Sequence, residues 1–226
     1  MTAGFPFLLA ADASVLADEA LFDAALRLVP PDRQQKVRRF AVAPARRLSL
    51  CAGLLLREAL SRLGIRSYEL EDGAYGKPHL KSCPDIHFNL SHSGDYALCA
   101  VSTGEIGCDI QQMSGSSPDI ARRFFTDAET AAIQAAGDED AQGELFFRIW
   151  SLKESVIKAT GQGLRTPLGS FEVLPGTESL VLGEQLYHLR EYFSLPGYSC
   201  AVCSVLPMDC PEIEILPLSE IIKRQP

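Results

Sequence analysis

Two carboxylates in separate parts of the chain have the residue type and the setting that divalent-cation chemistry requires. Asp109 lies near the end of the run Glu105–Ile110, which predicts a strand, and aspartate is uncommon inside strands. Glu154 lies on a predicted helix, four residues before Lys158. Carboxylates from two elements can share a hard cation such as Mg²⁺, which usually also contacts phosphate groups. Two plainer roles stay open on the residues alone: a strand-end turn for Asp109, and an i,i+4 ion pair, worth about 0.2–0.5 kcal/mol, for Glu154.

A second group of polar residues occupies positions 89–94, with the sequence Asn-Leu-Ser-His-Ser-Gly. Its hydroxyls, its imidazole and the N–H groups of a turn suit an anionic ligand, whereas an ordinary Asx or Ser turn is the plainer alternative. Gly76-Lys77-Pro78 is a further turn that carries one cation. The sequence contains no Walker loop and no G-x-S-x-G, G-x-G-x-x-G or H-E-x-x-H motif.

The charge of the chain is unevenly distributed. The formal net charge is −8, yet residues 27–66 carry ten basic and two acidic side chains. An acidic protein with a local basic cluster fits a specific polyanionic ligand better than a general nucleic-acid coat protein. Solvated helix faces are the alternative explanation. An RNA-binding module would need interleaved aromatic side chains for base stacking, and this segment contains only Phe40.

Hydrophobic periodicity and the helix and turn signals predict the elements that must position these groups. In the first part of the chain we expect a strand at Phe5–Ala11, followed by three helices at Ala13–Leu28, Asp32–Phe40 and Arg46–Leu63. Two further strands are expected at Ile86–Leu90 and Tyr96–Ser102, joined by a turn at Ser91–Asp95, and another strand at Glu105–Ile110. Thr126–Glu129 has capping-box spacing and predicts a helix start. Later strands are expected at Phe171–Leu174, Leu186–Phe193 and Tyr198–Leu206.

The helix that carries Glu154 is expected over about residues 144–160. At about 100° per residue, one face forms an apolar stripe of Leu145, Ile149, Leu152 and Val156. The opposite face carries Glu154 and Lys158 together with Phe147, Trp150 and Ser151. Large aromatic side chains are unusual on a solvent face, so we expect this helix to lie between a core and a cleft. A short repeat, Cys-Ala-Val at residues 99–101 and 200–202, indicates two halves of similar design.

Composition places the protein among ordinary globular chains. It has 226 residues, of which 46% are apolar, so it needs no disulfide or structural metal to form a core. The seven cysteines are odd in number and mostly lie in apolar runs, and the Cys200-x-x-Cys203 pair lies inside a predicted strand. No basic residue precedes Arg27, and no apolar run reaches about 18 residues. These features predict a cytoplasmic protein with reduced thiols and no membrane span.

The motifs occur together in an order that resembles the Sfp-type 4′-phosphopantetheinyl transferases. They are Gly76-Lys77-Pro78, then Phe88–Ser93, then Ile106–Ile110, then Trp150–Ser155 with Lys158. The resemblance runs from Pro31 to the strand at Tyr198. It implies an α+β monomer of two similar halves related by a pseudo-two-fold axis, with the active site in the cleft between them. The expected halves are residues 1–106 and 107–226, with a variable tail after residue 207.

The resemblance also implies a reaction. The 4′-phosphopantetheine arm of coenzyme A is transferred to a serine of an apo acyl or peptidyl carrier protein, and adenosine 3′,5′-bisphosphate is released. Fatty acid, polyketide and nonribosomal peptide synthesis all use such carriers. The implied metal is Mg²⁺, with Mn²⁺ as an alternative. We expect contacts with the acidic carrier at the basic segment and around residues 114–125. The competing hypothesis is a non-catalytic binder of coenzyme A or a carrier protein with the same fold.

The resemblance also assigns roles to individual residues of this chain, with one departure from the family pattern at Gln111. The metal carboxylates match Asp109 and Glu154, and Glu154 is also the candidate general base. Lys158 is expected to neutralise the leaving phosphate. The residues expected to bind coenzyme A, mainly at its 3′-phosphate and adenosine, are Arg33, Lys36, Arg47 in preference to Arg46, Lys77, Ser91 and His92. Gln111 stands where many relatives have an acidic residue, so either its amide oxygen or a water molecule takes that place at the metal.

Overall fold

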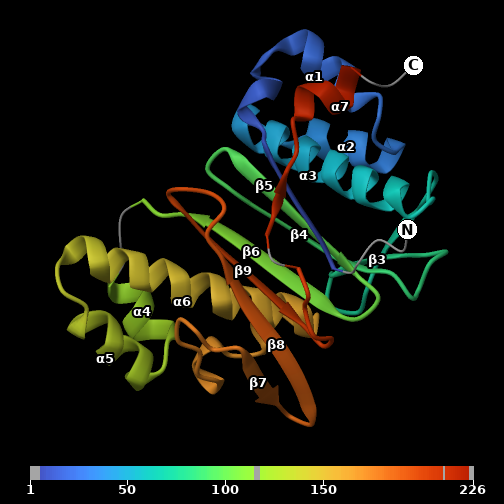
Figure 1. Cartoon of the computed structure of the whole chain (residues 1–226). Coiled ribbons are helices and arrows are strands. Elements are labelled where there is room, and N and C mark those ends of the chain that lie inside the picture. Colours follow the sequence, from blue (N-terminus) through green and yellow to red (C-terminus); the bar gives the residue numbers. More distant parts are fainter. Residues whose placement is uncertain (1–5, 115–117, 211, 224–226) are drawn as a thin grey trace.

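The computed structural model describes residues 6–114, 118–210 and 212–223 of the chain. Two four-stranded sheets lie next to each other, and each is covered by a long helix (Figure 1). In the first unit the strand order is β10-β1-β5-β4, and in the second it is β6-β9-β8-β7. The mixed α+β fold with two similar sheet-and-helix units confirms the predicted fold class. None of the helices in the described ranges is long and apolar enough to span a bilayer.

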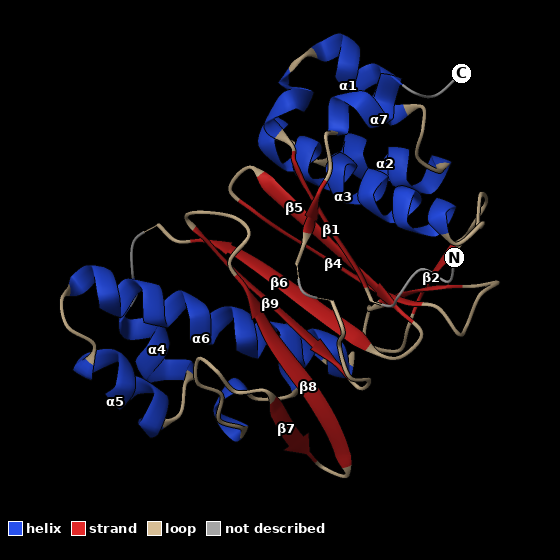
Figure 2. Cartoon of the chain, viewed as in Figure 1, coloured by secondary structure: helices blue, strands red, loops and turns tan. Residues whose placement is uncertain are grey.

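The first unit is built mostly from the N-terminal half of the chain. Its strands are β1 (Phe7–Asp12), β4 (His87–Ser93), β5 (Tyr96–Ser102) and β10 (Glu214–Ile215), and its helices are α1 (Glu19–Leu26), α2 (Pro31–Arg39), α3 (Ala43–Arg62) and α7 (Leu218–Lys223). A small hairpin of β2 (Leu70–Asp72) and β3 (Pro78–Leu80) stands beside the sheet. The buried face of α3 packs on β1, β4 and β5 and forms the core of this unit (Figure 2).

The second unit repeats this plan with a different set of helices. Its strands are β6 (Ile106–Gln112), β7 (Ser179–Leu182), β8 (Gln185–Tyr192) and β9 (Tyr198–Ser204), and its helices are α4 (Pro118–Phe124), α5 (Asp127–Ala135) and α6 (Glu139–Thr160). The predicted capping box is present, since the Thr126 side chain accepts from Glu129 N–H and the Glu129 carboxylate accepts from Thr126 N–H. The α6 helix packs across β6 and β9.

The Cys-Ala-Val repeat marks equivalent strands of the two units. Residues 99–101 lie in β5, which pairs with β1 and β4, and residues 200–202 lie in β9, which pairs with β6 and β8. Each of these central strands is covered by the long helix of its own unit, α3 or α6. A weak three-residue identity therefore identified the internal symmetry.

The C-terminal tail departs from the expected division of the chain. Instead of staying with the second half, it returns to the first unit, where β10 pairs in parallel with β1 and α7 lies against α1. Arg62 of α3 fixes the tail by two hydrogen bonds to the Glu214 carboxylate, at 2.6 and 3.0 Å.

The strand expected at Phe171–Leu174 is absent from the described residues. The N–H of Val173 donates to the Glu129 carboxylate at 2.8 Å instead of to a neighbouring strand.

A buried ion pair joins α6 to α5. The Lys153 ammonium lies 2.8 Å from Glu129 Oε1, and both side chains are fully buried. The ammonium also donates to the carbonyl oxygens of Leu168 and Phe171, each at 2.7 Å. Burial lowers the pKa of Lys153, and the hydrogen bond to Glu129 opposes that shift. This residue stands inside the family-like Trp150–Ser155 motif, yet its contacts are those of a structural residue.

Gly107 allows α6 to cross β6 at close range. A Cβ atom at this position would lie 2.2 Å from the Ser155 carbonyl oxygen and 2.3 Å from the Ala159 nitrogen, both of them backbone atoms. We expect Gly107→Ala to lower the free energy of unfolding by about 1–3 kcal/mol, because the helix must move away from the strand. Urea denaturation measures the change. Gly137→Ala is the control, since its Cβ would meet only Ala141 Cβ, at 3.9 Å, and an equal loss there would contradict the explanation.

Candidate functional site

The two sheets meet where β4 lies against β6, and side chains make this junction. Asn89 Oδ1 accepts from Cys108 N–H at 2.9 Å, and Ser93 Oγ accepts from Gln112 N–H at 3.0 Å. Ser91 lies between these two residues, on the same face of β4, because side chains two apart in a strand point the same way. The prediction of a turn at Ser91–Asp95 was therefore wrong in part: β4 continues to Ser93, and only residues 94 and 95 form the turn.

Asp109 is held at the centre of this junction and is only 1% exposed. Its Oδ1 accepts from the Ser91 hydroxyl at 2.8 Å and from the Lys158 ammonium at 2.5 Å. Its Oδ2 accepts from Gln111 Nε2 at 2.9 Å. Burial disfavours the charged form of Lys158, but the charge and hydrogen bond of Asp109, together with Cys108 and Glu154, outweigh burial and raise the pKa of Lys158. Three expected site residues thus meet at one point: Ser91 of β4, Asp109 of β6 and Lys158 of α6.

Glu154 faces the same point from one helical turn before Lys158. Burial raises the pKa of Glu154, and the negative charge of Asp109 raises it further, while Lys158 opposes both effects. Two carboxylates that repel each other in this way offer hard oxygen ligands to a divalent cation, so the donor set fits the expected metal. The described residues contain no group of three or more His, Cys, Asp or Glu side chains suited to a metal. Gln111 directs its amide nitrogen at Asp109, as a partner of that carboxylate.

A cationic pocket of about 260 Å³ opens beside this point, between α2, α3 and β4. Its polar lining includes Arg33, Lys36, Ser49 and His92. Arg33 is 9% exposed, and burial lowers the pKa of its guanidinium. Ser49 Oγ is buried without a hydrogen-bond partner within the described ranges. An unpartnered buried hydroxyl is costly, so its place among three potential cations indicates a site for an anionic ligand.

Ser49 was not predicted from the sequence. The available signal was weak: it is a single hydroxyl within the most apolar stretch of α3, residues 48–56. A serine in such a stretch commonly bonds to its own helix backbone, so the residue type gave no reason to choose it.

Arg46 and Arg47 lie elsewhere. They line a separate hollow of about 410 Å³, together with Glu19 and Asp23 of α1. Arg46 donates to the carbonyl oxygens of Phe40 at 2.9 Å and Ala41 at 3.3 Å, which fixes the connection between α2 and α3. The structure thus brings Arg33, Lys36 and His92 together but not Arg47, the arginine that the family resemblance favoured.

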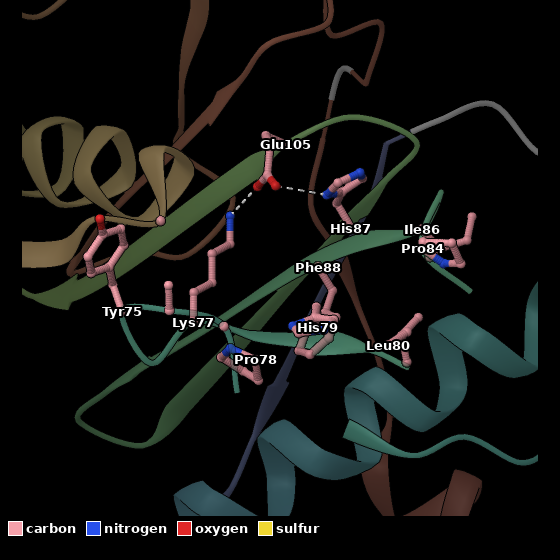
Figure 3. A pocket seen from close by; sticks show the side chains of 13 residues that line it. Tyr75, Lys77, Pro78, His79, Leu80, Pro84, Ile86, His87, Phe88 and Glu105 are labelled. Carbon is pink, nitrogen blue, oxygen red and sulfur yellow. Dashed lines mark hydrogen bonds and ion pairs between the residues drawn. The ribbon is translucent and has the colours of Figure 1, made fainter. Parts of the chain in front are cut away.

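Lys77 also lies outside the cationic pocket. It lines a neighbouring pocket, formed by the turn before β3, by β3 itself, by the start of β4 and by Glu105, which directly precedes β6 (Figure 3). Its ammonium contacts Glu105 at 2.6 Å, and Glu105 in turn lies 3.1 Å from His87 Nδ1. Pro78, the next residue, is shared by both pockets.

Two family models match this chain one after the other. The family model described as the 4′-phosphopantetheinyl transferase superfamily matches residues 105–203, and the model for the N-terminal part of 4′-phosphopantetheinyl transferases matches residues 17–104. The two matches meet next to β6, which supplies Asp109.

Curated relatives cover nearly the whole chain. A 4′-phosphopantetheinyl transferase of Bacillus subtilis is 36% identical over 208 residues, which cover 88% of this chain and 92% of the relative. The Sfp enzyme of B. subtilis strain 168 is 36% identical over 83% of this chain and 86% of its own length. The human L-aminoadipate-semialdehyde dehydrogenase-phosphopantetheinyl transferase is 34% identical over 66% of this chain and 53% of its own length.

Among solved structures, the holo-[acyl-carrier-protein] synthase of Thermotoga maritima aligns with 45% of this chain and 61% of its own, at 17% identity and a TM-score of 0.33. That similarity is too low to support an argument. The family models and the curated relatives carry the assignment. This chain therefore belongs to the 4′-phosphopantetheinyl transferase superfamily, whose enzymes use coenzyme A and generally a divalent metal to modify carrier proteins.

Proposed function

We propose that the protein transfers the 4′-phosphopantetheine arm of coenzyme A to a carrier serine at the junction of β4, β6 and α6. The observation that carries this proposal is the meeting of Asp109, Glu154 and Lys158 beside the cationic pocket. Phosphoryl transfer needs positioning and neutralisation of charge more than covalent help from the protein. A non-catalytic binder would not need a pair of carboxylates and a lysine at this point.

The cationic pocket would hold the 3′-phosphate of coenzyme A. Arg33, Lys36 and His92 would supply positive charge, and the Ser49 hydroxyl would donate the hydrogen bond that it lacks. Such contacts position the substrate and disfavour a coenzyme A that lacks this phosphate. Ser49 replaces Arg47 in the proposed set.

Glu154 and Asp109 would hold Mg²⁺, and this ion would supply Lewis-acid stabilisation of charge on the diphosphate. Glu154 is also the candidate base for the proton of the attacking serine, directly or through a water molecule. Lys158 would release Asp109 or the more distant carbonyl of Cys108, at 3.3 Å, to bind the leaving phosphate. The serine oxygen would bond to the phosphorus that carries the pantetheine arm, and the bond from this phosphorus to the bridging oxygen of the diphosphate would break. Adenosine 3′,5′-bisphosphate would leave, and the serine proton would pass to Glu154.

We propose that the protein works in the cytoplasm. All seven cysteines are free. Cys200 and Cys203 lie in different hydrophobic cores on opposite faces of β9, so this C-x-x-C pair cannot form a local disulfide. A chain with only reduced, mostly buried thiols fits a reducing compartment.

The test uses an apo peptidyl or acyl carrier domain, coenzyme A and Mg²⁺, with the carrier weighed by intact-protein mass spectrometry. We expect the carrier to gain one phosphopantetheine arm, and we expect EDTA to abolish the gain. A carrier that stays unmodified, although coenzyme A binds, would favour the non-catalytic binder.

Binding of phosphate should be coupled to protonation of His92. In the free protein, burial lowers the pKa of His92 below 6.5; the positive charges of Lys158 and Lys36 lower it further, and Asp109 opposes them. A bound phosphate would raise that pKa, so near pH 7 binding takes up a proton at His92. Calorimetry with adenosine 3′,5′-bisphosphate in two buffers of different ionisation enthalpy measures the uptake. His92→Gln should lose this component, and an unchanged proton balance in the variant would contradict the coupling.

A further inference from the structure

The ammonium of Lys77 has a partner for each of its protons. It donates to Glu105 Oε2 at 2.6 Å, to the Ile106 carbonyl at 3.0 Å and to the Ala159 carbonyl at 3.3 Å. An ammonium has three N–H groups, so no donor remains for a ligand unless one of these bonds breaks. Figure 3 shows this side chain reaching toward Glu105, which lies directly before β6.

Two of these acceptors belong to the elements that carry the proposed catalytic groups. Ile106 is the first residue of β6, and Ala159 lies in the last turn of α6. The carbonyl groups of the last helical turn lack partners within the helix, and a cation beside them is favoured by the helix dipole. One side chain from the first unit therefore joins the start of β6 to the end of α6.

The turn that presents Lys77 is itself fixed. Gly73 N–H donates to the Lys77 carbonyl at 3.0 Å, and Gly76, at φ +83°, adopts a conformation that favours glycine. Arg165 lies in the segment that follows α6, and its guanidinium carbon stands 4.8 Å from the centroid of the Tyr75 ring. The turn thus contacts the last turn of α6 through Lys77 and the segment after α6 through Tyr75.

We propose that Lys77 is a positioning residue, which fixes the spacing of β6 and α6 and thereby the place of Asp109 relative to Glu154 and Lys158. Asp109 follows Ile106 by three residues, and Lys158 directly precedes Ala159. The inference rests on the proposed roles of Asp109 and Glu154. It gives the Lys77 side chain a role other than the coenzyme A binding that the family resemblance implied for Lys77.

The test compares Lys77→Met with Lys81→Met. Methionine keeps the length of the side chain but removes its donors. For Lys77→Met we expect a loss of about 10–100-fold in turnover or in Mg²⁺ affinity, as for other residues that orient metal ligands. We expect the Kd for adenosine 3′,5′-bisphosphate, measured by calorimetry without Mg²⁺, to stay within about twofold. Lys81 is the matched control, because it lies on the same hairpin with its side chain 59% exposed, and its replacement should change none of these values.

The opposite result would overturn the proposal: a bisphosphate Kd that rises tenfold or more with unchanged Mg²⁺ affinity would make Lys77 an anion ligand. If Lys77→Met fails to fold, Lys77→Gln is the second variant, since it removes the charge and leaves too few N–H groups to serve all three acceptors. That variant should weaken Mg²⁺ binding in the same direction, and unchanged Mg²⁺ affinity in it would also overturn the role. A wild-type protein that transfers no arm contradicts the proposed function instead, and the calorimetric Mg²⁺ titration then still tests the role of Lys77.

Discussion

Glu154→Gln should lower turnover about 10²–10³-fold, the usual effect of removing one group that stabilises charge in a transition state. The amide is a weaker metal ligand and no base for the serine proton. Binding of adenosine 3′,5′-bisphosphate should change by less than about twofold, because the cationic pocket is formed by α2, α3 and β4 rather than by α6. Asp109→Asn should lose at least as much turnover, since Lys158 then also loses its charge partner.

Turnover is measured as carrier modification per minute at saturating coenzyme A, and binding is measured by calorimetry. Glu144→Gln provides a matched control, because this carboxylate lies on the same helix with its side chain 60% exposed. Variants of Asp109 and Glu154 that bind the bisphosphate much more weakly, yet turn over normally at saturation, would contradict these roles.

Lys153→Met should lower the free energy of unfolding by about 3–5 kcal/mol, because it leaves the carboxylate of Glu129 buried without its cation. The loss extends beyond the ion pair, since the same ammonium holds the carbonyl oxygens of Leu168 and Phe171. Glu129 in turn holds Val173 N–H, so the whole segment after α6 depends on this pair. The double variant Lys153→Met/Glu129→Gln should recover part of the loss, because it removes the uncompensated charge.

Urea denaturation of the wild type, the single variants Lys153→Met and Glu129→Gln, and the double variant gives the coupling energy of the pair. Lys81→Met, which changes an exposed lysine, should stay within about 0.5 kcal/mol of the wild type. A loss below about 1 kcal/mol for Lys153→Met would contradict the structural role of this lysine.

Local patterns in the sequence predicted the elements that carry the site. The α6 helix and the central strands β5 and β9 were found because their periodicity and their turn signals are local. The capping box at Thr126 was found for the same reason, since its two hydrogen bonds join residues three apart. The resemblance to the family then assigned Asp109, Glu154 and Lys158 to one predicted site.

The other features of the fold and the site depend on contacts between residues far apart in sequence, and short sequence patterns do not show such contacts. Ser49 became a candidate only when α3 was seen beside α2 and β4. The Lys77 side chain is directed at carbonyl groups 29 and 82 residues away in sequence, so its motif could not reveal its partners. The tail belongs to the first unit through β10, a strand of two residues that is too short to give a periodic signal.

The junction of β4 with β6 has a mechanical consequence. Within each sheet the strands exchange backbone hydrogen bonds, whereas Cys108 and Gln112 donate across the junction to the side chains of Asn89 and Ser93. A side chain can rotate away without breaking a strand ladder, so these amides can open to water while both sheets stay intact. Hydrogen exchange should therefore be faster at Cys108 and Gln112 than within β5 and β9, and substrate that bridges the two units should slow it. The junction between the two units should therefore open at a lower free energy than either sheet.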